Sequence, residues 1–204
     1  MLRLVNVSRR FGEKQIVEKV SLTVNPGEIV CLAGPSGIGK TTLLEIMAGI
    51  LLPDSGTVDR QAKPALMFQD DALILWLTAK DNITYVLPDD ISSADASAIA
   101  GKWLQFFDLE ARQYPPAMSG GMRRRLSLGR TFASGRRLIL LDEPFAFLDE
   151  AWQKKVAKEI AAFAVKGSGI LLTSHSTAFL DMPYFREVPY RVFSLTEPPI
   201  VIDA

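Results

Sequence analysis

Residues 34–42 read Gly-Pro-Ser-Gly-Ile-Gly-Lys-Thr-Thr and carry the residue types that hold a phosphate group. They match the phosphate-loop pattern G-x-x-x-x-G-K-[ST] at every fixed position. Glycines let the backbone turn so that successive N–H groups face one anion, and a helix that starts directly afterwards adds the positive end of its dipole. We therefore expect the nucleotide phosphates to be bound by Gly34, Pro35, Ser36, Gly37, Gly39, Lys40, Thr41 and Thr42.

Two carboxylates, Asp142 and Glu143, follow the apolar run 138–141. A carboxylate at the C-terminal end of a parallel strand lies where open α/β sheets bind their ligands. We expect Asp142 and the Thr41 hydroxyl to hold Mg²⁺, while Lys40 supplies positive charge to the β- and γ-phosphates. Glu143 can then polarise the attacking water as a general base. An isolated Asp-Glu pair is usually a solvated strand end, but the phosphate loop upstream favours the functional interpretation.

A second glycine-rich segment, Ser119-Gly120-Gly121, precedes an expected helix. Its serine and backbone amides at a helix start form a second potential anion cradle. One small chain has little use for two cradles around a single nucleotide, so the second cradle needs an explanation of its own.

Composition restricts the class of protein. The chain has 204 residues, enough for one domain, and Lys+Arg and Asp+Glu both total 23, which argues against a general polyanion binder. The single cysteine, Cys31, excludes an internal disulfide and is expected to be a buried core residue. No run approaches the roughly 18 apolar residues of a membrane span. We therefore expect a soluble, cytoplasmic chain that meets a membrane only through a partner.

The elements that position these residues follow from the spacing of apolar side chains. Alternation predicts half-buried antiparallel strands over residues 2–7 and 20–24. Apolar runs predict buried strands over 28–33, 65–68, 138–141 and 169–173, with a turn at 53–56 and short closing strands at 190–194 and 200–202. Helices are expected from the phosphate loop to Gly49 and over 92–107, 123–132 and 151–164.

Short apolar strands that alternate with helices predict an α/β fold, a phosphate-loop (P-loop) NTPase sandwich with a mostly parallel sheet. The strands at the N-terminus predict an antiparallel β subdomain, and residues after 68 lose their strand character. We expect a single domain, residues 1–204, in which segments 1–68 and 137–204 form the nucleotide-binding core. Residues 69–136 are expected to form an inserted helical subdomain that carries the Ser119-Gly120-Gly121 segment.

With the signature Met118-Ser-Gly-Gly-Met122, the chain resembles the ATP-binding cassette (ABC) ATPases over residues 2–202. The matching features occur in the order of that family. They are an aromatic residue at Phe11, the phosphate loop, Gln69, the signature, the Asp142-Glu143 pair, Leu148-Asp149 and His175.

The resemblance implies an ATPase that uses ATP and Mg²⁺. It implies that Phe11 stacks on adenine, that Gln69 reaches the metal and the attacking water, and that His175 contacts the γ-phosphate. An aromatic residue is often ordinary core, and a lone histidine is usually structural. Family position favours the functional interpretation of both.

The resemblance also implies a head-to-tail dimer, which would explain the second cradle. Ser119, Gly120 and Gly121 of one subunit would contact the ATP held by the other, and Asp149 would lie at the dimer contact. A DNA-repair ATPase would need long coiled-coil arms, a translation factor of this superfamily would need two cassettes, and a P-loop kinase or GTPase would leave the signature unexplained.

The resemblance further implies a transporter subunit, peripheral on the inner face of the cell membrane through a permease, with a solute-binding protein as a further candidate partner. Residues 70–78 are similar to the importers of nitrate, sulfonate, taurine and thiamine precursors, although Leu75 stands where that branch commonly has proline. An ABC exporter or another non-import ABC complex is the alternative.

Three residues depart from the family pattern. Met122 replaces the commoner glutamine, Arg124 stands where glutamine is frequent, and Phe147 replaces a small residue beside Asp149. The arginine-rich stretch invites comparison with nucleic-acid-binding segments. Because the rest of the chain balances its charge, we expect a solvated or ion-paired helix face there. The arginines concerned are Arg123, Arg124, Arg125, Arg130, Arg136 and Arg137.

Overall fold

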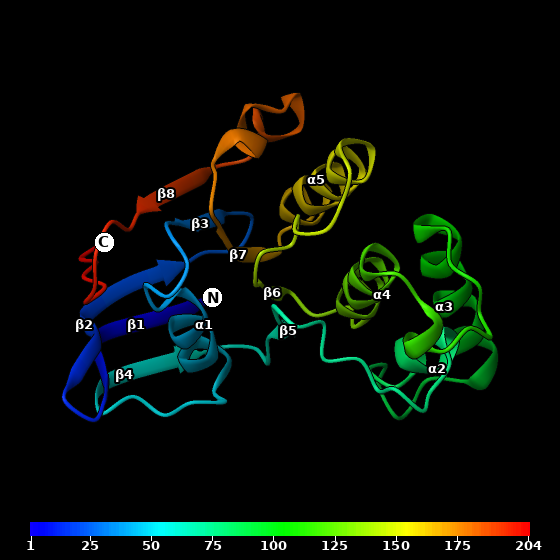
Figure 1. The fold of residues 1–204 in the computed structure, drawn as a ribbon, viewed down its shortest axis with the longest axis horizontal. Coiled ribbons are helices and arrows are strands. Elements are labelled where there is room, and N and C mark those ends of the chain that lie inside the picture. Colours follow the sequence, from blue (N-terminus) through cyan, green and yellow to red (C-terminus); the bar gives the residue numbers. More distant parts are fainter.

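Two β-sheets of different kinds form the frame of the molecule. The computed structural model describes residues 1–204 and is shown in Figure 1. All neighbouring strands of the larger sheet are parallel, in the order β5-β6-β7-β3-β8. Its strands are β3 (Ile29–Ala33), β5 (Ala65–Met67), β6 (Leu138–Leu141), β7 (Gly169–Ser174) and β8 (Tyr190–Ser194). The smaller sheet is antiparallel, in the order β2-β1-β4, and consists of β1 (Leu2–Phe11), β2 (Lys14–Val24) and β4 (Ser55–Arg60).

The helices lie on both sides of the parallel sheet. One of them, α1 (Lys40–Ala48), lies beside the antiparallel sheet, whereas α2, α3 and α4 gather at the opposite end of the molecule (Figure 1). The others are α2 (Ala79–Thr84), α3 (Ser93–Phe107), α4 (Gly120–Ala133) and α5 (Glu150–Val165), with short 3₁₀ turns η1 (Pro115–Ala117), η2 (Ala178–Asp181) and η3 (Pro183–Phe185). None of these helices is both long and apolar enough to cross a membrane.

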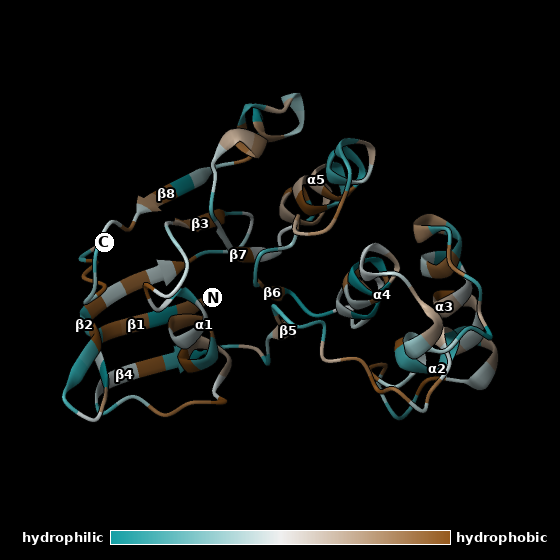
Figure 2. Cartoon of the chain, in the orientation of Figure 1, coloured by the Kyte–Doolittle hydropathy of each residue, from teal (hydrophilic) through white to brown (hydrophobic).

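Alternation along the parallel strands divides the apolar side chains between two cores. On β3, Ile29 and Cys31 face the core shared with α2 to α5, while Val30 and Leu32 face the core shared with β1, β2 and α1. Successive strand residues point to opposite faces, so a continuous apolar run serves a sheet that is covered on both sides. Cys31 is fully buried, as expected. Polar residues (teal in Figure 2) occupy the outward side of α5, opposite its apolar residues.

Aromatic rings join the helical segment to the rest of the molecule. The Trp103 ring of α3 lies 5.4 Å from the Phe132 ring of α4 and 6.2 Å from the Phe163 ring of α5, centroid to centroid. Phe107 of α3 stacks on Trp152 of α5 at 6.1 Å. Large rings bury much apolar area, so these contacts fix α3 and α4 against α5. Helices α2 to α4 therefore share one core with the parallel sheet.

The predicted fold class is confirmed, with two corrections among the elements. Residues 200–202 do not form a strand. Ile200 and Ile202 are buried, and their carbonyls accept hydrogen bonds from Glu18 and Ser21 N–H at 2.9 and 2.7 Å, but only isolated bridges result. Pro198 and Pro199 have no N–H, so hydrogen bonding to β2 begins only at Ile200, whose N–H donates to the Ile16 carbonyl at 2.8 Å.

Strand β4 is the second correction, because its first two residues belonged to the predicted turn at 53–56. Gly56 has φ +86°, as turn glycines do, yet Ser55–Arg60 pairs with β1 along most of its length. The far end of β4 is tied to α1, since Arg60 donates hydrogen bonds from Nε to the Met47 carbonyl and from Nη2 to the Ile46 carbonyl, both at 2.6 Å. Pairing with a distant strand thus prevailed over local turn chemistry.

Candidate nucleotide-binding site

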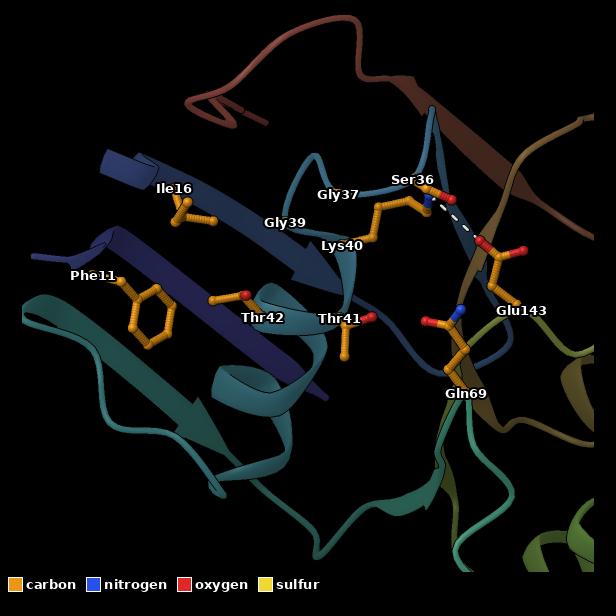
Figure 3. A pocket seen from close by; sticks show the side chains of 10 residues that line it. All are labelled: Phe11, Ile16, Ser36, Gly37, Gly39, Lys40, Thr41, Thr42, Gln69 and Glu143. Atoms are coloured by element: carbon orange, nitrogen blue, oxygen red, sulfur yellow. Dashed lines mark ion pairs between the residues drawn. The ribbon is translucent and has the colours of Figure 1, made fainter. Parts of the chain in front are cut away.

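The glycine-rich loop joins β3 to α1 (Figure 3). Gly37 and Gly39 have φ values of +77° and +111°, in the left-handed region that favours glycine. A Cβ at Gly39 would lie 2.5 Å from Cγ2 of Ile16, so a side chain there would also collide with β2. The backbone shape of the loop therefore requires glycine at positions 37 and 39. Helix α1 starts directly after the loop.

Lys40 is buried and aimed at the mouth of the loop. Only 5% of the residue is exposed, and its Nζ donates hydrogen bonds to the carbonyls of Gly34 (2.7 Å) and Pro35 (3.0 Å). The same Nζ lies 3.4 Å from Oε1 of Glu143 (Figure 3). A buried ammonium needs such partners, because its desolvation is costly. The charge is thus held inside the loop where an anion would bind.

Asp142 directly follows β6 and is only 2% exposed. Its Oδ2 accepts a hydrogen bond from Oγ1 of Thr41 at 2.6 Å, and its Oδ1 accepts one from Oγ1 of Thr173 at 2.5 Å. The Thr41 hydroxyl, the Asp142 carboxylate and the nearby Gln69 amide are all oxygen donors. Hydroxyl, carboxylate and amide oxygens are hard ligands of the kind that Mg²⁺ prefers. The donor set therefore fits magnesium.

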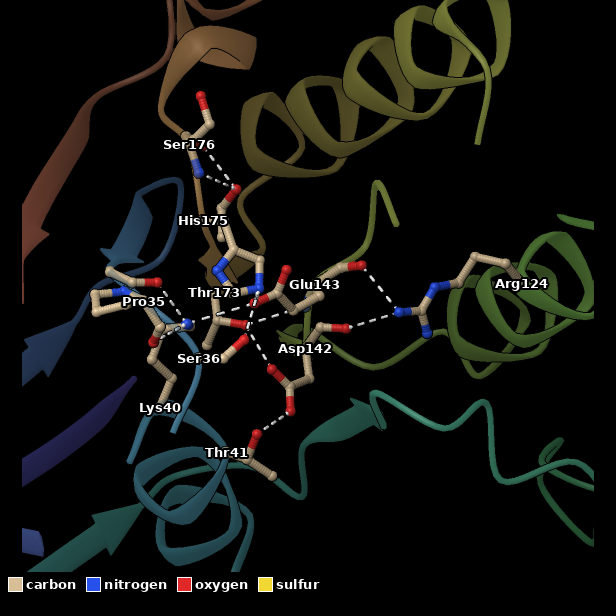
Figure 4. A network of polar contacts seen from close by, with 12 residues as sticks. Pro35, Ser36, Lys40, Thr41, Arg124, Asp142, Glu143, Thr173, His175 and Ser176 are labelled. Carbon is tan, nitrogen blue, oxygen red and sulfur yellow. Dashed lines mark hydrogen bonds and ion pairs between the residues drawn. The ribbon is translucent and has the colours of Figure 1, made fainter. Parts of the chain in front are cut away.

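Glu143 turns out of the strand direction and meets the other charged groups. Its backbone has φ +53°, and its N–H donates to Oγ1 of Thr173 at 3.0 Å. Its Oε1 lies 2.9 Å from Nε2 of His175, which in turn lies 3.4 Å from Oγ of Ser36 (Figure 4). A carboxylate, an imidazole and the Lys40 ammonium thus converge at the mouth of the glycine-rich loop.

A cavity of about 490 Å³ opens in front of this group, within the range of small-molecule sites. Phe11 lies at the edge of the cavity and is 49% exposed, with the Arg9 guanidinium 4.9 Å from its ring centroid. An exposed ring at the edge of a phosphate cavity offers a flat face to an aromatic base. The lining residues are Phe11, Ile16, Ser36, Gly37, Gly39, Lys40, Thr41, Thr42, Gln69 and Glu143.

The signature residues and Asp149 stand apart from this cavity. Ser119, Gly120 and Gly121 are not among its lining residues. Ser119 caps α4, accepting a hydrogen bond at Oγ from Met122 N–H at 3.2 Å, and Asp149 caps α5 through Trp152 N–H at 2.9 Å. The second cradle thus exists as a helix start but does not reach the phosphate loop within one chain.

Two buried polar residues of the site were not predicted. Thr173 is fully buried and bridges Asp142 and Glu143. Its signal was a hydroxyl in the otherwise apolar run 169–173. Arg124 is also fully buried, and it binds the loop after β5 and the backbone after β6.

The prediction of a solvated or ion-paired arginine face is wrong in its solvated part for Arg124 and Arg130, whereas Arg136 and Arg137 are exposed as expected. Arg124 pairs with Asp71, but it and Arg130 are buried, and Arg130 donates to the carbonyls of Asp71 and Ala72. Arg136 donates to the Pro64 carbonyl at 2.6 Å. Arg124 and Arg130 bind buried carbonyl groups, because helix α4 faces loops whose backbone acceptors need donors.

Comparison with known proteins places these features in context. Residues 17–146 match the family model described as "ABC transporter". The chain is 36% identical, over 83% of its length and 72% of the relative, to the aliphatic sulfonates import ATP-binding protein SsuB of Corynebacterium glutamicum. It is 35% identical, over 95% of its length and 81% of the relative, to the taurine import ATP-binding protein TauB of Chromobacterium violaceum.

A solved structure extends the likeness to three dimensions. The fold superimposes on a dimeric ATP-binding cassette in a post-hydrolysis state, bound to ADP and Pi, with a TM-score of 0.86 and 25% identity. The match covers 100% of this chain and 97% of that one.

Proposed function

Because the chain belongs to the ABC transporter family, we propose that it is the ATP-hydrolysing subunit of an importer for a small solute. The observation that carries the proposal is the convergence of Lys40, Glu143 and His175 at a glycine-rich loop. Asp142 lies beside them and accepts a hydrogen bond from Thr41. The related SsuB and TauB proteins are both import ATP-binding proteins, which supports import over export.

Each residue of the group then has a role in phosphoryl transfer. The loop amides and Lys40 bind the β- and γ-phosphates, and Phe11 stacks on adenine. Glu143 takes the proton of the attacking water, while His175 and Gln69 orient the water and the γ-phosphate. Thr41, Gln69 and Asp142 would hold Mg²⁺, which supplies charge neutralisation for the phosphates.

A second copy of the chain completes the site in this proposal. Ser119 and the amides of Gly120 and Gly121 lie outside the cavity of their own chain and form an N-terminal helix end, where anions bind. Across a head-to-tail dimer they would close on the γ-phosphate of the partner, with Asp149 near the contact. The dimeric cassette of the same fold supports this arrangement.

The transport partner of the proposal is a permease, which would hold the ATPase on the inner face of the cell membrane. The two relatives are import proteins for aliphatic sulfonates and for taurine, so we propose a small sulfonate as the solute class, with a solute-binding protein as a further partner. Vesicles that contain the ATPase with its permease should accumulate taurine or an alkanesulfonate. Uptake of nitrate alone would overturn the solute class, and export of the sulfonate would overturn import.

Replacing the proposed base tests the hydrolytic role directly. Glu143→Gln removes the proton acceptor and should slow phosphate release by about 10²–10⁴-fold while ATP binding is retained. The matched control is Glu150→Gln, since Glu150 is exposed on α5 and pairs only with Lys154. The control should hydrolyse ATP at the parental rate, and a Glu143→Gln chain that does the same would refute the assignment.

A further inference from the structure

Arg124 is the largest side chain that is fully buried, and it lies on α4 shortly after the signature residues. A guanidinium cannot be removed from water without acceptors for its N–H groups. The acceptors it has found come from two separate segments of the nucleotide site, and neither segment is near Arg124 in the sequence.

The first segment is the loop that follows β5. Nη1 of Arg124 donates to the Phe68 carbonyl at 3.0 Å and lies 3.0 Å from Oδ1 of Asp71. Phe68 directly precedes Gln69, a lining residue of the phosphate cavity. The same loop is held from α4 by Arg130 and by Ser127, which donate to the Asp71 carbonyl at 2.9 and 3.1 Å. The position of Gln69 is thus tied to helix α4.

The second segment is the backbone of the two carboxylates. Nη2 of Arg124 donates to the Glu143 carbonyl at 3.0 Å and lies 3.4 Å from the Asp142 carbonyl (Figure 4). Glu143 has φ +53°, a conformation that a residue with a side chain adopts only when its surroundings impose it. Thr173 holds the N–H of Glu143, and the Glu143 carbonyl accepts hydrogen bonds from Arg124 and from the Ala146 N–H (3.1 Å), so both sides of the strained residue are fixed.

We propose that Arg124 is a positioning residue that holds Glu143 in its left-handed conformation and links the proposed base to the signature helix. This inference rests on the proposed role of Glu143. Nη1 of Arg124 binds the loop after β5, and Nη2 binds the carbonyls after β6. Nε has no hydrogen-bond partner. A movement of α4, which begins at the signature, is therefore transmitted to the carboxylate that activates water.

Lysine cannot reproduce this geometry, because its single ammonium replaces a planar fork by a point charge. In Arg124→Lys, Glu143 loses its fixed orientation, so kcat for ATP hydrolysis should fall by about tenfold or more while KM for ATP changes little. Asp71→Asn keeps the buried arginine and weakens only its anchor, so kcat should fall by a smaller factor, about 2–5-fold. This second variant keeps the proposal testable if Arg124→Lys does not fold.

The decisive measurement combines each variant with Glu143→Gln in single-turnover hydrolysis. If Arg124 acts through Glu143, neither Arg124→Lys nor Asp71→Asn slows the residual reaction of the Glu143→Gln chain. If the losses multiply, Arg124 has only a structural role and the inference is wrong. Arg125→Lys is the matched control, because Arg125 donates to the Phe107 carbonyl from the same helix, outside the nucleotide site. The factor by which Glu143→Gln slows hydrolysis should be the same in the Arg125→Lys chain as in the wild type.

The outcomes separate this inference from the proposed function. If the Glu143→Gln chain were as active as the wild type, Glu143 would not be the base, and both the proposed role and this inference would be wrong. The inference alone would be overturned if the Glu143→Gln chain is slow and the rate losses of the Arg124 and Asp71 variants multiply with that of Glu143→Gln.

Discussion

Glu143, the proposed base, has a strained backbone. A non-glycine residue in the left-handed region costs about 1–3 kcal/mol, and the surrounding structure must supply that energy. Here Thr173 and Arg124 hold the two peptide groups of Glu143, and its carboxylate reaches Lys40 and His175 as a result. The strained backbone is what directs the carboxylate into the cavity.

Phe11 is the residue on which base recognition depends in our proposal. Phe11→Ala removes the exposed ring and should weaken ATP binding by about 2–10-fold, because an aromatic stack contributes about 0.5–1.5 kcal/mol. Binding of inorganic tripolyphosphate, which has no base, should not change. Tyr114→Ala, which removes a comparably exposed ring outside the cavity, is the control. Equal losses for ATP and tripolyphosphate in Phe11→Ala would contradict the stacking role; both affinities can be measured by calorimetry.

Some residues of the site can be predicted from short sequence motifs, whereas others depend on contacts that only the fold creates. Lys40, Thr41, Asp142 and Glu143 were predicted from short motifs, and the structure places them together. Thr173 was not predicted, because its contact with Asp142 exists only once β7 lies beside β6. Arg124 was expected on a helix face, and nothing local indicates which carbonyls that face would meet. The sequence thus predicted the polar groups that meet at the glycine-rich loop better than the residues that hold those groups in place.

At the scale of elements, Glu28 connects the start of β3 to its neighbours. Its carboxylate accepts hydrogen bonds from the N–H and side chain of Asn25 (3.1 and 2.9 Å) and from Arg191 of β8. Burial raises the pKa of Glu28, but the hydrogen bonds from Arg191 and Asn25 outweigh it and hold the pKa below its ordinary value of 4.5. The ionised carboxylate therefore stabilises the junction of β2, β3 and β8.

The sign of the pH dependence follows from this depressed pKa. The stabilisation by Glu28 is complete above the unfolded pKa and is lost as the pH falls through the lower, folded pKa. Glu28→Gln should lower the free energy of unfolding at neutral pH by about 1–3 kcal/mol, and the loss should shrink as the pH falls below about 4.5. Urea titrations between neutral and acidic pH measure both. Glu110→Gln, on the exposed surface, is the control; a Glu28→Gln deficit that does not change with pH would contradict the assignment.

The elements themselves were largely predictable. Continuous apolar runs identified β3, β6 and β7, and apolar spacing identified α3 and α5, because those patterns reflect burial that the final fold provides. Strand β4 was not predicted, since Gly56 carries turn chemistry and pairing with β1 is not visible in its own residues. The 200–202 segment was overpredicted, because its buried isoleucines form only isolated bridges.

At the scale of the whole molecule, the proposed function requires two chains. With ATP bound and hydrolysis blocked by Glu143→Gln, light scattering should show a dimer, since the nucleotide then remains between the subunits. Ser119→Arg places a long charged side chain at the exposed start of α4 and should abolish the ATP-dependent dimer while each chain still binds ATP. Ser93→Arg, at the exposed start of α3, is the matched control and should dimerise. A Ser119→Arg chain that dimerises normally, or a Glu143→Gln chain that stays monomeric even with its permease, would contradict the composite site.

The strand order has a consequence for synthesis on the ribosome. The glycine-rich loop follows β3 and the carboxylates follow β6, yet these two strands do not touch, because β7 lies between them. A nascent chain whose β6 has left the exit tunnel therefore cannot yet bring the two halves of the nucleotide site to their final separation. Only when residues up to Ser174 have emerged can β7 enter between its neighbours. The two halves of the nucleotide site therefore come together only after β7 has been translated.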